Sequence, residues 1–573
     1  MTRSGMAIIR SSKRHWLCNA AASLFLVPLN AFMFMLALIV SAGLAQAQEL
    51  KYTLSVDAEN VFQDIYSEDD RQTLNTTNFI IRPRLNLSYR NKRASLTWGA
   101  THNHVRRGLE DLDVTNNYTN YNYRGSYDLV ENLLQFTANG ALNYQNVGAS
   151  GFLVDDFLTN AQNLSKTRSN RYGLNLNLPR GDYFGHQTQI AYSNTESERN
   201  INSFAQLNSK VYNINTNTFS GNNFERFRFG VQTGFTISER PDNGDFASRQ
   251  VDAELAYQIY NGFGALVSTS HEANQVSSSE TSFSRLQDFN SIGAGIIWQA
   301  ADNRSISLTW NRADSDAIEE DEDNKGYVGL DINWRFTPRT SLAAEYERRF
   351  FGEAGSFSFQ HQIRRFRTQI RYSEEVTSFA RLISNPDNLG VFVCTDGVSE
   401  LAACFQPNSL NYQLAPNEQF VQFSEQDTEI NDEIILRKAL SWQLGVQQRR
   451  TRISINGRYA TNDFLETNRL SRTYSAGSLL SFQIGRRTNF SWTLNAAYTD
   501  ESIDGESGSS DVYSSKLSIS RDLGRYFKLA LDFSYLDREV EGRVLSSGTG
   551  AAGINGSLQD RRVALNLSYR LAN

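Results

Sequence analysis

Hydrophobic and polar residues alternate with a period of two along almost the whole chain. The pattern is clearest between residues 563 and 571, where apolar or aromatic residues alternate with small or polar ones. The same alternation recurs in residues 81–89, 227–235, 251–257, 490–498 and 527–535. Alternation over such lengths predicts amphipathic β-strands, each with one apolar face and one polar face.

The connections between these segments alternate between short and long. Eleven tight turns are indicated, at residues 90–93, 130–132, 179–185, 220–224, 260–263, 300–303, 337–340, 364–365, 448–451, 485–488 and 522–525. Longer polar stretches lie between them, including residues 105–116, 145–166, 194–210, 313–325, 375–430, 499–511 and 536–559. Short turns on one rim and long loops on the other are typical of outer-membrane barrels. The pattern predicts about 24 strands (roughly 22 to 26), and an even number places both termini on the periplasmic side.

We interpret the strands as one all-β domain, a transmembrane antiparallel up-and-down β-barrel over residues 48–573. The alternative is a soluble β-sandwich or propeller, whose strands usually have about five or six residues. The segments here are nearer the roughly nine to eleven residues that a tilted strand needs to cross a bilayer. Tyr, Trp and Phe also gather at strand ends, as aromatic girdles require. Because the first strand, residues 52–60, follows the leader closely, we expect no plug or periplasmic domain beside the barrel.

The first 47 residues have the layout of a secretory signal peptide. Positive charges at Arg3, Arg10, Lys13 and Arg14 precede an apolar run over residues 24–44, which ends in Ala45-Gln46-Ala47. Small residues in this spacing mark a cleavage site before Gln48. A retained membrane anchor is the alternative, but the apolar run is interrupted by Pro and Asn. We therefore expect an exported protein that resides in the bacterial outer membrane.

Composition agrees with this interpretation. The mean hydropathy is −0.47 and 40% of the residues are hydrophobic, which excludes a bundle of transmembrane helices. Aromatic residues nevertheless make up 12% of the chain, as expected when one strand face meets lipid and the other meets water. The net charge of −6 is spread along the chain, so nucleic acid is not an expected partner.

If the apolar face of each strand meets lipid, the opposite face lines the lumen, and that face is rich in arginine. The candidate lumen-facing residues are Arg82, Arg84, Arg226, Arg228, Arg367, Arg371, Arg452 and Arg458. Inward arginines attract anionic solutes through the field of a confined channel. The alternative is a lattice of internal salt bridges, because carboxylates fall on the same face at Asp252, Glu254, Asp331, Glu345, Glu347 and Asp532.

Two cysteines remain after removal of the leader, Cys394 and Cys404, both within the longest non-periodic stretch. In an oxidising compartment we expect them to form a disulfide that closes a loop. The stretch offers too few ligands for a metal site, so no metal or other cofactor is expected. We expect the loop over residues 375–430 to fold partly into or over the barrel mouth, because a barrel this wide is otherwise open. No nucleophile and base stand out by spacing, so an enzyme is not expected.

The chain resembles the uncharacterised outer-membrane barrels found with PEP-CTERM and exopolysaccharide gene systems. The likeness is carried by the strand that follows the leader, by the segment Asn78-Phe-Ile-Ile-Arg-Pro-Arg-Leu-Asn-Leu-Ser-Tyr89, and by the tail Arg562-Val-Ala-Leu-Asn-Leu-Ser-Tyr-Arg-Leu571. This resemblance implies export of an exopolysaccharide across the outer membrane, beside a periplasmic polysaccharide-export protein. The family supplies no site residues.

The last strand also resembles the signal that the barrel-assembly machinery reads, although the chain does not end on an aromatic residue. Outer-membrane lipid and lipopolysaccharide are the other expected partners. Two further functions stay open beside polysaccharide export, namely a general diffusion porin for small anions and a surface-structural or adhesive barrel.

Overall fold

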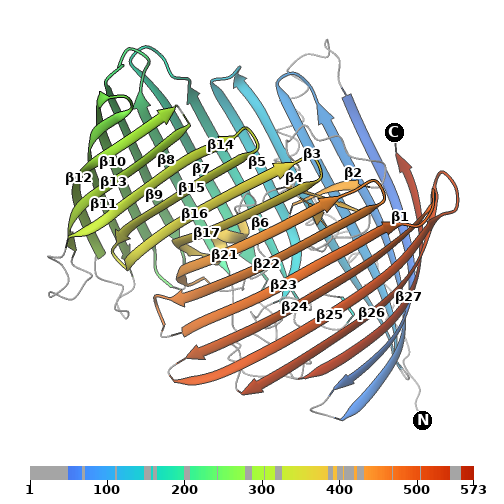
Figure 1. Ribbon diagram of the computed structural model, residues 1–573. Coiled ribbons are helices and arrows are strands. Elements are labelled where there is room, and N and C mark those ends of the chain that lie inside the picture. Colours follow the sequence, from blue (N-terminus) through green and yellow to red (C-terminus); the bar gives the residue numbers. More distant parts are fainter. Residues whose placement is uncertain are drawn as a thin grey trace, which may run out of the picture.

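The protein is described by a computed structural model of the 573-residue chain (Figure 1). The structure describes residues 49–67, 71–109, 112–146, 157–158, 164–198, 207–241, 243–277, 287–301, 303–315, 326–384, 391–395, 404–405, 418–422, 432–467, 469–503, 505–542 and 557–572. The expected signal peptide, residues 1–47, lies outside the described residues. No helix within these described ranges is long and apolar enough to cross a membrane.

Twenty-four antiparallel strands form one sheet that closes on itself (Figure 1). Each strand pairs with its neighbours in the chain, and β1 pairs with β27 from Thr53 opposite Ala572 to Ser67 opposite Leu558. The first twelve strands are β1 (Glu49–Ser67), β2 (Gln72–Arg90), β3 (Ala94–Leu109), β4 (Leu112–Val130), β5 (Leu134–Asn146), β6 (Leu164–Leu178), β7 (Phe184–Ser197), β8 (Asn208–Ser220), β9 (Phe227–Glu239), β10 (Phe246–Tyr260), β11 (Phe263–Val276) and β12 (Gln287–Ala301). The others are β13 (Arg304–Ser315), β14 (Tyr327–Thr337), β15 (Thr340–Arg349), β16 (Gly352–Ile363), β17 (Phe366–Ser378), β21 (Ile434–Gln447), β22 (Thr451–Phe464), β23 (Arg469–Gln483), β24 (Thr488–Ile503), β25 (Glu506–Asp522), β26 (Phe527–Gly542) and β27 (Leu558–Ala572).

The segment between β17 and β21 holds the remaining elements. These are one short helix, α2 (Phe379–Ser384), and a separate three-stranded sheet of β18 (Val391–Thr395), β19 (Cys404–Phe405) and β20 (Glu418–Gln422). Cys394 lies directly opposite Cys404 in the register of β18 and β19. Directly opposite residues on antiparallel strands have Cα atoms about 4.5–5.5 Å apart, within the range that a disulfide bridges. The backbone therefore agrees with the predicted disulfide, which remains a prediction.

The predicted fold class is confirmed, and the strand number is the expected 24. All eleven tight turns fall on one rim, which we call the turn rim, and the longer connections fall on the opposite, loop rim. Asn261 and Gly262 show why a turn is this short, because both have positive φ (46° and 82°) in the two-residue link from β10 to β11. Positive φ at both central positions defines the type I′ turn that matches strand twist, and Asn-Gly suits it best.

Two stretches predicted as long loops are strands instead. β3 reaches Leu109 and β4 starts at Leu112, and β24 reaches Ile503 before β25 starts at Glu506. β26 likewise continues to Gly542. β1, β2 and β4 have 19 residues each, far more than the roughly nine to eleven that cross a bilayer. A strand this long extends past the hydrocarbon, where water wets the outer face as well. Residues 105–116 and 499–511 show no regular apolar alternation from which a strand could be predicted.

The outer face is apolar around the barrel. Ile292, Ile296 and Trp310 are each more than 60% exposed, and alternate residues of the other strands follow the same rule. Side chains of this kind stay exposed only when lipid covers them, so the belt places the barrel in a membrane. A closed antiparallel barrel leaves no unpaired backbone in the hydrocarbon, and among bacterial proteins this architecture belongs to the outer membrane.

Aromatic girdles border the belt, as the sequence predicted. Near the turn rim, Phe263 stacks on Trp298 with ring centroids 5.8 Å apart, and Trp298 contacts Trp334 at 5.4 Å. Toward the loop rim, Tyr474 lies 4.8 Å from Tyr459 and 6.1 Å from Tyr498. Aromatic rings at both heights match the two interfaces of a bilayer.

Candidate functional site

The inner wall follows from the same alternation, since residues between two lipid-facing positions point into the lumen. Seven of the eight predicted arginines lie on this face: Arg82 and Arg84 on β2, Arg228 on β9, Arg367 and Arg371 on β17, and Arg452 and Arg458 on β22. Arg226 does not, because the turn before β9 extends to residue 226 and leaves Arg226 exposed at the turn rim. The alternation therefore predicted correctly which way an arginine faces only where the strand itself includes that arginine.

Arg82 and Arg84 belong to an ion-pair lattice. A guanidinium nitrogen of Arg82 lies 2.7 Å from a carboxylate oxygen of Glu59, and Arg84 lies 3.4 Å from Asp57. Glu59 and Asp57 are on β1, so each pair ties the two strands together next to the seam where the barrel closes. For these two arginines the salt-bridge alternative is confirmed. Neither carboxylate was singled out from the sequence.

Arg371 and Arg458 belong to another part of the wall. Both stand opposite Ser441, Arg371 from β17 and Arg458 from β22. Adjacent strands are about 4.8 Å apart, so the two residues flank Ser441 at the same height. Arg367 and Arg452 lie on the same strands nearer the turn rim. This wall is basic, and we call it the basic wall (Arg367, Arg371, Arg452 and Arg458).

The neighbouring wall is acidic. The predicted inward carboxylates of β10, β14 and β15 all face the lumen, and Glu272 of β11 joins them; this acidic wall comprises Asp252, Glu254, Glu272, Asp331, Glu345 and Glu347. Asp331 stands directly opposite Glu345, an arrangement of like charges that destabilises a sheet. Arg349 of β15 donates two hydrogen bonds to Glu272, at 2.7 and 2.9 Å. The lumen is therefore electrostatically divided, which the sequence alone did not show.

Contacts across the lumen close part of the loop rim. Arg240, between β9 and β10, has a fully buried side chain that pairs with Glu466, which lies between β22 and β23. Arg240 also donates to the carbonyl oxygens of Asp432 at 2.8 Å and of Gly244 at 2.9 Å. The paired walls are ten strands apart in a ring of 24, so the contact joins nearly opposite sides.

The helix α2 makes a second contact of this kind. It leaves β17 and lies inside the barrel against β6, β7 and β8. Thr195 of β7 donates to the carbonyl oxygen of Ala380 at 3.3 Å, and the hydroxyl oxygens of Ser384 and Ser193 are also 3.3 Å apart. On the opposite side Phe379 packs on Phe464 of β22, with ring centroids 6.0 Å apart. The start of the long loop thus folds into the mouth, as the sequence predicted.

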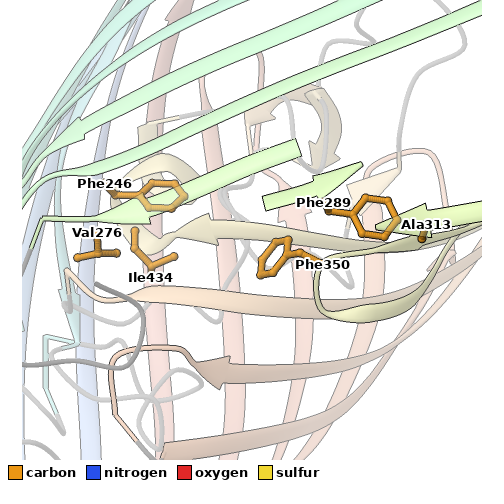
Figure 2. Close-up of a cluster of buried hydrophobic side chains, with 6 residues drawn as sticks. All are labelled: Phe246, Val276, Phe289, Ala313, Phe350 and Ile434. Carbon is orange, nitrogen blue, oxygen red and sulfur yellow. The ribbon is translucent and has the colours of Figure 1, made fainter. Parts of the chain in front are cut away.

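A cluster of buried apolar side chains makes a third contact of this kind. Figure 2 shows Phe246 and Val276 of β10 and β11 beside Ile434 of β21, with Phe350 near Phe289. All five are at most 5% exposed. Burying each such side chain stabilises the closed arrangement by about 1.5–3 kcal/mol relative to exposure in water. We call the ion pair, α2 and this cluster together the cross-lumen bridge (Arg240, Glu466, residues 379–384 and the cluster of Figure 2).

Comparisons with known proteins return barrels and no relative in sequence. No family model and no curated protein matches the chain. Solved structures with similar folds include the siderophore receptor PirA from Acinetobacter baumannii (8% identity, 92% of this chain and 81% of that chain, TM-score 0.40). They also include the FrpB iron transporter from Neisseria meningitidis (8%, 91% and 82%, TM-score 0.39) and OmpTdeltaL8, an outer membrane protein of Vibrio cholerae (7%, 92% and 100%, TM-score 0.28). Values this low carry no information about a substrate, which has to be inferred from the chain's own residues.

Proposed function

We propose that this barrel is a gated outer-membrane channel that exports an exopolysaccharide. The observation that carries the proposal is a polar lumen that is crossed at the loop rim by the cross-lumen bridge. A barrel of 24 strands encloses more space than its own wall side chains fill. A permanently open pore of that width would leak small solutes, and a channel for a polymer therefore needs a closure that opens during transport.

The position of the closure favours export. The bridge lies at the loop rim, which in outer-membrane barrels faces outward, and the lumen below it is polar. Arg240, Glu466, Phe350 and α2 lie in connections between strands, and connections move more readily than a strand ladder. A polymer that enters from the periplasm therefore reaches the bridge last. The resemblance to barrels of exopolysaccharide systems agrees with this direction, and a periplasmic export protein would deliver the polymer.

The charge distribution does not favour a general porin for small anions. The acidic wall occupies β10–β15 and lies beside the basic wall, so anions meet repulsion over a large part of the lumen. A surface-structural or adhesive barrel is the second candidate. The specific observation in its favour is the tall side of the barrel, where the 19-residue strands β1, β2 and β4 project beyond the membrane.

Deletion of the gene in the producing bacterium tests the proposed function. Export predicts that polysaccharide disappears from the cell surface and accumulates in the periplasm, and that a plasmid copy restores it. Unchanged surface polysaccharide together with lost cell adhesion would favour the second candidate. The Glu131→Gln variant is a suitable control for expression, because Glu131 pairs with Lys92 at an exposed turn, 3.9 Å apart.

A further inference from the structure

The inner wall formed by β6–β10 carries a band of amide side chains at mid-height. Two rows of residues cross these five strands in register. The first row is Asn177, Gln187, Asn217, Gln232 and Asp252, and the second is Asn175, Gln189, Asn215, Gly234 and Gln250. We call these ten residues the amide track. Its second row continues on β5, where Gln135 stands opposite Asn175.

The track lines a hollow in the wall of about 560 Å³, a volume typical of ligand pockets. Gly234 contributes no side chain to the hollow. Even a Cβ atom at this position would lie 3.5 Å from the Asn215 amide oxygen, so the hollow has room here. Gln187, Gln189 and Gln232 are exposed to the lumen. Among the described residues, Gln187 donates to Asn177 at 3.3 Å, Gln250 donates to Asp252 at 2.9 Å and Asn215 donates to Asn213 at 2.6 Å.

The track leads to the cross-lumen bridge. Gln189 lies on β7 four residues before Ser193, the residue that meets α2. At about 3.3 Å per residue, this places the track roughly 13 Å from the helix, on its periplasmic side. A polymer held on the track therefore lies directly before the closure.

From this arrangement we infer that the amide track binds the transported chain, and that this chain is a neutral, hydroxyl-rich saccharide. The inference rests on the proposed function. An amide presents both a donor and acceptors, and a sugar hydroxyl does the same, so each can satisfy the other in any orientation. Amides spaced about 4.8 Å apart across neighbouring strands offer repeated weak sites, which conduction requires because a tightly held polymer would not leave.

The same geometry argues against an anionic polymer. Asp252 ends the first row, and Glu254 is the next inward residue along β10. A carboxylate accepts hydrogen bonds from saccharide hydroxyls but repels an acidic saccharide. The expectation from sequence that inward arginines select an anion therefore applies to the basic wall and to Arg228, which lies on β9 two inward positions from Gln232, toward the turn rim. The track predicts the opposite preference.

Current block in planar bilayers tests the inference. The open background is the full chain with Arg240→Ala and Glu466→Ala, and the probes are maltoheptaose, a neutral linear glucose oligomer, and an oligogalacturonate of equal length. Maltoheptaose is expected to block at a concentration about tenfold lower than the acidic oligomer. The triple variant Gln187→Thr, Gln189→Thr and Asn217→Thr should raise its half-blocking concentration by about tenfold, as loss of a net hydrogen bond or two predicts.

A matched control places the same substitution on other walls. Gln360→Thr, Gln369→Thr and Asn495→Thr also replace inward amides, on β16, β17 and β24, and should change the half-blocking concentration less than twofold. Heat-modifiable migration of each variant reports folding. Equal or stronger block by the acidic oligomer, or an unaltered block in the triple variant, would overturn the track while leaving a polysaccharide channel in place. Ion conductance with no block by either oligomer would overturn the channel proposal and the track together.

Discussion

Replacing Arg240 by alanine should open the channel. The guanidinium of Arg240 is fully buried, and its partner Glu466 is only 7% exposed. Removing one member of a buried ion pair typically costs about 3–5 kcal/mol, because the other charge stays buried without compensation. The carbonyl oxygens of Asp432 and Gly244 also lose a donor, at 2.8 and 2.9 Å.

That free energy falls on the closed state alone if the bridge exists only when the channel is closed. Since about 1.4 kcal/mol is a factor of ten, the open-to-closed ratio should rise by roughly two to three and a half orders of magnitude. A channel open about one part in 1,000 of the time would then be open about half of the time. Glu466→Gln should have a smaller effect, because a glutamine oxygen still accepts the backbone N–H of Ile434, which lies 3.0 Å from Glu466.

Single-channel recording measures the open probability directly. Wild type should be mostly closed, Glu466→Gln intermediate and Arg240→Ala mostly open, and Glu131→Gln at the exposed pair should match wild type because surface ion pairs contribute little. Equal open probabilities in wild type and in folded Arg240→Ala would show that the buried ion pair does not hold the channel closed. Fluorescence from a single dye beside α2 should report the same order of opening.

The remaining predictions concern the wall, the belt and the long loop. Arg82→Gln with Arg84→Gln should lower the temperature of heat-modified migration, since Glu59 and Asp57 lose their partners. Arg371→Gln, at an exposed side chain of the lumen wall, should shift the reversal potential toward cations. An unchanged reversal potential in Arg371→Gln would show that the basic wall does not act on permeating ions. Ile296→Arg, on the lipid face, should destabilise folding in lipid vesicles by about 2–4 kcal/mol, and a change below 0.5 kcal/mol, about the scatter of a neutral surface substitution, would contradict the lipid-facing belt. Cys394 and Cys404 should resist thiol labelling until reductant is added, and immediate labelling of both would exclude the disulfide.

The sequence was sufficient to predict what lipid imposes and insufficient for what the lumen imposes. Each lipid-facing position must be apolar, so alternation shows strand number, turns and facing, as in β12 with Ile292 and Ile296. Beyond the membrane that constraint ends, so the polar residues 105–116 and 499–511 give no sign in the sequence that they form strands. Arg226 failed for a related reason, because a turn ends the alternation one residue before β9 begins.

Contacts across the lumen are not encoded locally at all. Arg240 and Glu466 are 226 positions apart. Each lies among other polar residues in its own connection between strands, so neither can be singled out from the sequence. The amide track can be recognised only when the pairing of the strands is known, because each of its rows takes one residue from each of five strands. The alternation predicts that these amide side chains face the lumen. Their alignment into rows depends on the pairing register of neighbouring strands, which the sequence does not show. Five of the six carboxylates of the acidic wall were predicted to face the lumen, whereas Glu272 and the grouping of all six into one wall were not.

On the export route that we propose, polysaccharide passes through the lumen and past α2. Ser193→Cys with Ser384→Cys tests it, because the native hydroxyl oxygens are 3.3 Å apart and a disulfide there would lock the helix to β7. Cells that carry only this variant should export polysaccharide normally in reductant, stop when the pair is oxidised, and resume when reductant returns. Undiminished export from fully cross-linked barrels would contradict the claim.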